Sequence, residues 1–189
     1  MLFRSGSNGK DRRFRNNAFE KIGLFSESRT EDDDVKVLGV LKNKRTWRYI
    51  PSKYVDMSHE NLRCWKTLCP GANGAGVFGE SLSPLVIGEP CIGYTQTFIG
   101  IGAFESRFEA KAVMKYVKSK FARALLDVLK VTQHNDRGVW KLIPIQDFTT
   151  SSDIDWSKSI HEIDLQLYRK YGLDENEIEF IETHVKEMA

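Results

Sequence analysis

Short runs of apolar and β-branched residues predict β-strands over the first hundred residues of the chain. Residues 35–41, VKVLGVL, are the clearest of these runs and predict one strand. Further strands are expected at five places: residues 47–50, 62–68, 84–87, 94–101 and 139–145. Residues 1–30 are polar and rich in turn formers, so they predict an arm that precedes the sheet.

The apolar positions of residues 107–131 follow a helical period. They recur every three to four residues and form one face that predicts a single long packed helix: Ala110, Val113, Val117, Phe121, Ala124, Leu125 and Val128. Ser106 and Glu109 have the spacing of a capping box at the helix start.

The last forty residues predict two short amphipathic helices. Ser159 can cap the first, and Gly172 stops it in the usual way. Asp174 and Glu177 repeat the capping-box spacing before the second. The predicted fold class is therefore α+β, with a mixed or antiparallel sheet, one long packed helix and a C-terminal helical pair. The predicted boundary separates residues 1–150 from a helical appendage at 151–189.

Composition narrows the class of protein. The chain has 189 residues, 41% hydrophobic, with no apolar run near the roughly 20 residues of a membrane span. Three cysteines are too few and odd in number for a disulfide framework, and the first residues lack the apolar segment of a secretory signal. We expect a soluble, cytoplasmic protein without a membrane partner.

The net charge of +2 conceals a strong segregation. Residues 1–30 carry seven basic and three acidic side chains, residues 42–66 seven and two, and residues 107–141 nine and three. Residues 142–189 carry four basic and eleven acidic side chains. A polyanion-binding body with an acidic appendage gives this pattern, and so does ordinary solvated surface.

Catalytic chemistry finds little support in the sequence. Residues 98–102, FIGIG, match the glycine motif of methyltransferases superficially, but the Asn/Asp-Pro-Pro-aromatic tetrapeptide of adenine methylases is absent. Glu109 and Lys111 have a nuclease-like spacing within the predicted helix, without a second carboxylate partner. His59, Cys64 and Cys69 lie five residues apart, which does not suit zinc. We predict no catalytic residue, no metal ligand and no cofactor in this chain.

DNA-binding chemistry fits better, because duplex recognition needs cations for phosphates and amides or hydroxyls for base edges. The candidate phosphate contacts are Arg12, Arg13, Arg15, Lys42, Lys44, Arg45, Arg48, Lys53, Lys111 and Lys115. The candidate base contacts are Asn73, in the glycine-rich loop 69–79, and Gln96 and Thr97, on the strand predicted at 94–101. Asn73 also suits a left-handed turn, and the Gln96 amide could instead bond a buried backbone group.

Several segments resemble the target-recognition regions that follow the methyltransferase domain in restriction-modification enzymes. These segments are LCPGANGAGVFG at 68–79, YTQTFIGIGAF at 94–104, YVKSKFARAL at 116–125, PIQDF at 144–148, DIDWSKS at 153–159 and IDLQLYRKYGL at 163–173. The last three of these segments resemble the tails of type II restriction enzymes fused to an adenine-specific DNA methyltransferase, and the resemblance as a whole covers the chain from about residue 40.

The resemblance implies the specificity module of such an enzyme, which recognises double-stranded DNA. S-adenosylmethionine and Mg²⁺ are then expected only on a methyltransferase or nuclease domain elsewhere, in cis or in trans. Two other functions stay open at this point: a restriction endonuclease with an atypical carboxylate centre, and a non-catalytic scaffold between protein domains.

Overall fold

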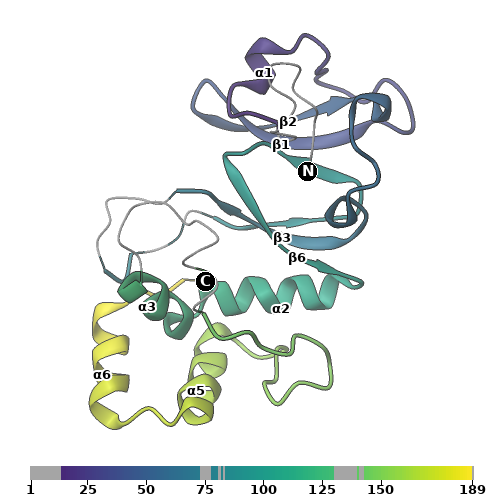
Figure 1. Cartoon of the computed structure of the whole chain (residues 1–189). Coiled ribbons are helices and arrows are strands. Elements are labelled where there is room, and N and C mark those ends of the chain that lie inside the picture. The colour runs from purple at the N-terminus through teal and green to yellow at the C-terminus, as the bar shows by residue number, and fades with distance from the viewer. Residues whose placement is uncertain are drawn as a thin grey trace. The chain divides into compact units, whose positions relative to one another are not determined.

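The computed structural model describes residues 14–72, 78–80, 82, 84–129, 140 and 143–188 (Figure 1). The chain forms two compact units. The first comprises Met1–Cys69 and Val86–Arg107, and the second comprises Pro70–Leu85 and Phe108–Ala189, so the backbone passes between them three times. This division differs from the boundary predicted at residue 150. Whether residues 1–150 act as one functional module stays a prediction.

A three-stranded mixed sheet, sheet A, is one of the two sheets of the first unit. Strand β1 (Val35–Leu41) pairs antiparallel with β2 (Lys44–Ile50) and parallel with β5 (Ile92–Tyr94). Helix α1 (Ala18–Lys21) packs on β1, and the Phe19 ring occupies the space that a side chain at Gly39 would need. One face of sheet A is therefore covered by the segment that precedes it.

A second sheet, sheet B, completes this unit in the order β4-β3-β6. Its strands are β3 (Trp65–Pro70), β4 (Val86–Gly88) and β6 (Phe98–Phe104), and short 3-10 turns at Ser52–Tyr54 and Glu60–Arg63 lead into it. Leu38 of sheet A packs with Leu68 and Phe98 of sheet B. A larger apolar cluster lies on the other face of β1 and β2 and contains Phe14, Ala18, Val35, Val37, Ile50, Val55 and Leu62.

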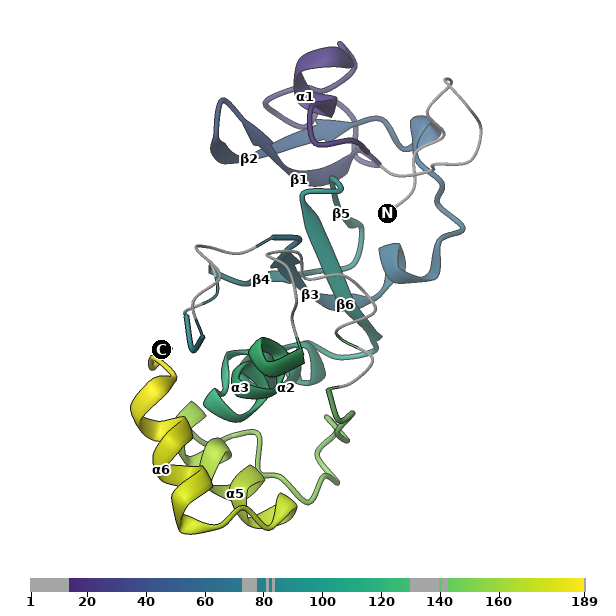
Figure 2. The same ribbon diagram turned by 60° about the vertical axis from the view of Figure 1, so that its left-hand side comes forward.

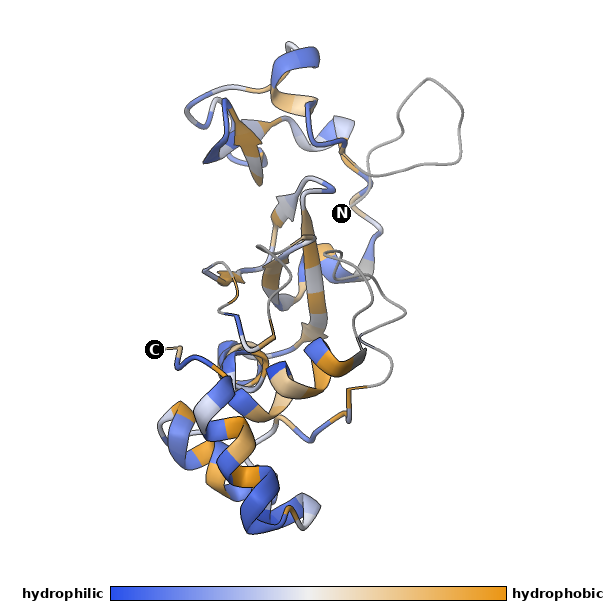
Figure 3. Cartoon of the chain, turned by 90° about the vertical axis from the view of Figure 1, so that its left-hand side faces the viewer, coloured by the Kyte–Doolittle hydropathy of each residue, from blue (hydrophilic) through white to orange (hydrophobic). Residues whose placement is uncertain are grey.

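The second unit is helical. Its helices are α2 (Arg107–Lys118), α3 (Lys120–Leu129), α5 (Ile160–Tyr171) and α6 (Glu175–His184), and Figure 2 shows α5 and α6 joined by a short turn. Figure 3 shows hydrophilic and hydrophobic residues sharing these helices, as amphipathic packing requires. Helix α3 contacts both α5 and α6. Around Tyr116, the rings of Phe148 and Trp156 form an aromatic cluster with centroids 5.2–6.1 Å apart.

Both C-terminal helix starts are confirmed. Ser159 and Glu162 form a complete capping box, and Asp174 and Glu177 form another. Gly172 adopts a left-handed conformation (φ 66°), and its N–H donates to the last carbonyls of α5. The α+β class and the C-terminal helical pair follow the sequence-based expectation.

Several details of the prediction are wrong. The helix expected at 107–131 breaks at Ser119, whose hydroxyl accepts the N–H of Ala122 and so caps α3. On α3, Phe121 and Ala124 of the predicted apolar face are buried, but Val128 is 72% exposed, and Leu126, outside that face, is buried. The strand expected at 94–101 is interrupted by a turn at residues 95–97. In the strand expected at 139–145, Trp140 is helical and residues 143–145 are irregular.

Candidate nucleic-acid interface

The β1–β2 hairpin concentrates positive charge. Residues 35–50 contain five Lys or Arg side chains and no acidic residue. Leu41 pairs with Lys44, so only Lys42 and Asn43 form the connecting turn. Lys42, Asn43, Lys44 and Arg45 are all exposed. Within the described part of the chain, the side chains of Lys42, Asn43 and Lys44 make no hydrogen bond or ion pair. The tip of the hairpin therefore presents cations and one amide to solvent.

Aromatic rings lie under several cations of this unit. The Lys36 ammonium lies 4.8 Å from the centre of the Trp47 ring, and the Arg45 guanidinium lies 5.5 Å from the Phe98 ring. On β2, which also carries Trp47, the centre of the Tyr49 ring lies 5.9 Å from the Arg29 guanidinium. These contacts hold long side chains close to the sheet, which lowers the entropy that they lose when they bind a ligand.

The turn between β5 and β6 lies at the same end of sheet A as the hairpin tip. Because β5 runs parallel to β1, both strands point toward this end of the sheet. The last residue of β5, Tyr94, pairs with Leu38, three residues before the end of β1, and the Thr95 N–H donates to the Leu38 carbonyl at 2.9 Å. Gln96 follows in this turn, with its side chain exposed. The contact of Arg45 with Phe98, just after the turn, confirms the proximity. We call residues 42–45 and 95–97 together the basic end of sheet A.

The N-terminal segment also meets the basic end. The Gln96 N–H donates to the Phe14 carbonyl at 2.7 Å. Arg15, the next residue, is exposed. Six of the predicted site residues therefore lie in the first unit on the strand ends, turns and adjoining segment at this end of sheet A: Arg15, Lys42, Lys44, Arg45, Gln96 and Thr97.

Other predicted residues have different surroundings. Arg48 is largely buried and forms an ion pair with Glu27 at 2.8 Å. Lys53 is exposed, with its ammonium 5.4 Å from the ring of neighbouring Tyr54. Arg12, Arg13 and Asn73 lie outside the described residues.

Two predicted lysines, both on α2, belong to the second unit. Lys111 is exposed. The Lys115 ammonium donates to the carbonyls of Trp156, Ser157 and Lys158 at 2.9, 3.2 and 2.5 Å. Lys115 thus ties the segment before α5 to α2, a structural contact that its predicted role did not anticipate.

The structure corrects the predicted placement of Gln96 on a strand and shows the surroundings of Thr97. Gln96 lies in a turn, where its side-chain amide is exposed and makes no hydrogen bond within the described part of the chain. The Thr97 hydroxyl is paired with that of Thr95 at 3.2 Å. Asn43 was missed as a candidate, although LKNK between two β-branched runs is a recognisable turn signal, because the second strand was expected to begin only at Trp47.

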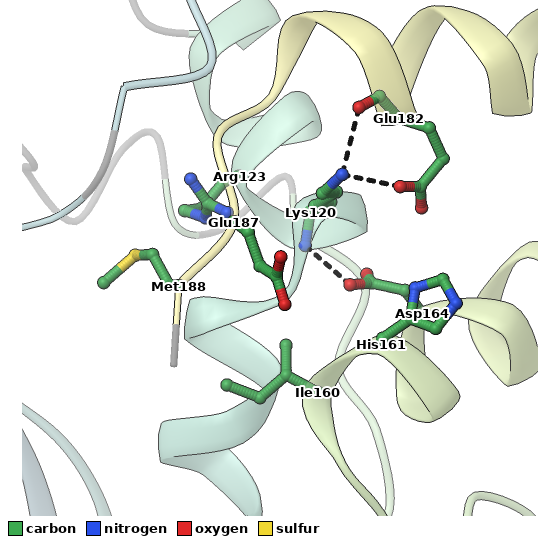
Figure 4. A pocket seen from close by; sticks show the side chains of 8 residues that line it. All are labelled: Lys120, Arg123, Ile160, His161, Asp164, Glu182, Glu187 and Met188. Carbon is green, nitrogen blue, oxygen red and sulfur yellow. Dashed lines mark hydrogen bonds and ion pairs between the residues drawn. The ribbon is translucent and has the colours of Figure 1, made fainter.

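A charged pocket of about 390 Å³ lies in the second unit (Figure 4). Several of its charged side chains are already engaged. The Lys120 ammonium pairs with Glu182 at 2.5 Å, and Asp164 accepts the N–H groups of Lys120 and Phe121 at 3.1 and 2.9 Å. Asp164 thus caps the start of α3 from α5, and the pocket is built as a structural network.

The buried members of this network have altered proton affinities. Burial raises the pKa of Asp164 to about 6, against its two backbone hydrogen bonds. Burial also lowers the pKa of Arg123, whose guanidinium donates to the carbonyls of Lys118, Glu80 and Lys186. Arg123 is only 1% exposed, so it joins three backbone segments from inside the unit.

Sheet B contains one more buried cation, Lys66. Its ammonium donates to the carbonyls of Asn61, Cys64 and Glu89 at 2.7–3.3 Å. Burial lowers the pKa of Lys66 to about 8. Because backbone carbonyls surround it, Lys66 holds the turn before β3 against the loop after β4 and is not available at the surface.

Among the described residues, no three His, Cys, Asp or Glu side chains are close enough to hold a metal ion. No helix in the same set is long and apolar enough to cross a bilayer. Comparisons with protein-family models, curated proteins and solved structures find no match to this chain. The basic end of sheet A is therefore the strongest candidate site on its geometry alone.

Proposed function

We propose that this protein binds duplex DNA through the basic end of sheet A and serves as the specificity module of a restriction-modification enzyme. One observation carries the proposal. The β1–β2 hairpin and the β5–β6 turn bring exposed cations and exposed amides to one end of a sheet. Cations supply phosphate contacts, and amides supply base contacts.

The shape of the hairpin favours DNA over RNA. The major groove of B-DNA admits a two-stranded β-ribbon, whereas the major groove of A-form RNA is too deep and narrow for side chains to read. The hairpin ends in a two-residue turn, so its tip is as narrow as a β-ribbon can be. The resemblance to target-recognition regions also supports duplex DNA. It further suggests that a methyltransferase or nuclease domain supplies S-adenosylmethionine and Mg²⁺ chemistry.

Binding is tested by fluorescence anisotropy with a labelled 30-base-pair duplex at several salt concentrations. The wild type should bind, with an affinity that falls steeply as salt rises, because bound cations release counterions. The triple variant Lys42→Gln, Lys44→Gln, Arg45→Gln should lose at least tenfold in affinity at low salt. Its log–log salt slope should fall by about 2–3, since each phosphate contact contributes about 0.9.

A matched control removes the same charge from exposed positions elsewhere: Lys21→Gln, Lys158→Gln and Arg169→Gln. This control should bind as the wild type does. Equal affinities and equal salt slopes for the two triple variants would show that only net charge matters, and the proposed interface would be wrong.

A further inference from the structure

The two residues of the hairpin turn differ in how well they tolerate its left-handed backbone conformation. Lys42 and Asn43 both adopt left-handed backbone conformations, with φ of 47° and 61°. A two-residue hairpin turn of this kind matches the twist of its strands and favours Asn, Asp or Gly. Asn43 fits this preference, whereas lysine at Lys42 is strained. The chain therefore keeps a lysine where glycine or asparagine would be more stable.

Strain of this kind persists where a side chain has another role. The Lys42 side chain is exposed and has no partner in the described part of the chain that could offset the strain. Asn43 stands between Lys42 and Lys44 at the outermost point of the ribbon. Its amide offers a donor and an acceptor together, the pattern that pairs with the N6 and N7 groups of adenine.

We propose that Asn43 reads a base edge in the major groove while Lys42 and Lys44 contact the flanking phosphates. This inference rests on the proposed function and assigns the specificity-determining residue of that site. The hairpin tip is then the part of the protein that distinguishes one DNA sequence from another.

Glycine variants separate this role from that of a turn former, because glycine accepts the left-handed conformation and carries no amide. A preferred site is first selected by the wild type from a library of randomised duplexes. Binding to that site and to a scrambled duplex is then compared. Asn43→Gly should lower the ratio of the two affinities about 5- to 160-fold, as expected for loss of a bidentate base contact. Its affinity for the scrambled duplex should stay within twofold.

Lys42→Gly should behave differently. It should weaken binding to both duplexes by the same factor, because a phosphate contact carries no sequence information. It should also raise Tm by about 1–4 °C as the strain is relieved. Asn176→Ala, which removes an exposed amide from α6, serves as the control and should change neither affinity nor preference.

The outcomes separate the inference from the proposed function. If the wild type binds and the charge variant of the hairpin does not, an unchanged preference in Asn43→Gly overturns the inference alone. Wild-type binding without any selected site also overturns it. If the wild type fails to bind duplex DNA under any salt condition, the proposed function falls, and the role of Asn43 falls with it.

Discussion

In the first unit the cations of the hairpin tip lie exposed on a ribbon without acidic residues, whereas in the second unit the cations of α3 point inward and meet carboxylates and carbonyls. The side chains of Lys42 and Lys44 have no hydrogen-bond or ion-pair partner in the described part of the chain, but the Lys120 ammonium is paired with Glu182 and Arg123 is 1% exposed. The first arrangement leaves charge available to a polyanion. The second uses charge to join helices.

The same residue type therefore has different roles in the two units, and sequence position alone does not separate them. Removing one partner of a buried ion pair lowers the free energy of unfolding by several kcal/mol, because the other charge is left buried without compensation. An exposed cation contributes little to stability and much to binding a polyanion. Substitutions in the second unit should therefore change stability first, and substitutions at the basic end of sheet A should change DNA affinity first.

The largest expected effect comes from Arg123→Ala. This change removes three hydrogen bonds to backbone carbonyls and the positive charge that interacts with Asp164 and Asp127. We expect the free energy of unfolding of the helical unit to fall by about 3–5 kcal/mol. The measurement is urea unfolding together with hydrogen exchange of α3 and α5.

Arg45→Ala is the matched control for Arg123→Ala, since it removes an arginine that is exposed. It should cost less than about 1 kcal/mol in stability while lowering DNA affinity. A stable Arg123→Ala protein would show that the network of the second unit is not structural, and the contrast between the units would fail.

The second effect concerns pH. Because burial raises the pKa of Asp164 to about 6, the folded state holds a proton that the unfolded state, with its ordinary pKa of 3.8, has released. Stability from this group is therefore present at low pH and is lost as pH rises through 6. Between pH 5 and pH 7.5 the loss should be about 1–1.5 kcal/mol.

Asp164→Asn sharpens this comparison because it removes the titration while keeping one acceptor for α3. The variant should be less stable than the wild type at pH 5, and the difference should shrink by about 1–1.5 kcal/mol at pH 7.5. Urea unfolding at both pH values measures it. Parallel pH dependence in the two proteins would mean that Asp164 does not titrate in this range.

Local sequence signals predicted the elements whose causes are local. The run VKVLGVL gave β1 to its last residue, and Ser159 and Asp174 marked the starts of α5 and α6. The start of β2 was missed because residues 44–46 are polar at the hairpin tip. The break at Ser119 was missed because apolar residues continue at helical spacing on both sides of it.

Which residues lie near one another in the candidate site was harder to predict than their chemical types. The cations and amides of the candidate site were among the residues predicted from the sequence, but their grouping depends on the parallel pairing of β1 with β5, which are distant in sequence. The cap that Asp164 provides for α3 likewise comes from another helix. A lysine such as Lys115 looks like a surface cation in the sequence, since nothing local indicates the three carbonyls that it meets.

The smallest expected effect separates the two predicted lysines of α2. Lys115→Ala removes the hydrogen bonds that hold residues 156–158 and should lower the free energy of unfolding by about 1–2 kcal/mol, because the carbonyls lose a charged donor. Lys111→Ala removes an exposed side chain of the same type from the same helix and should change stability by less than about 0.5 kcal/mol.

If Lys111 contacts phosphate, its loss should weaken binding to all duplexes about equally and reduce the salt slope by about 0.9. Thermal unfolding and anisotropy on the same two variants decide between the roles. A Lys115→Ala protein with unchanged Tm and weaker DNA binding would show that Lys115 contacts DNA and is not needed for stability. The distinction between inward and outward cations would then fail on α2.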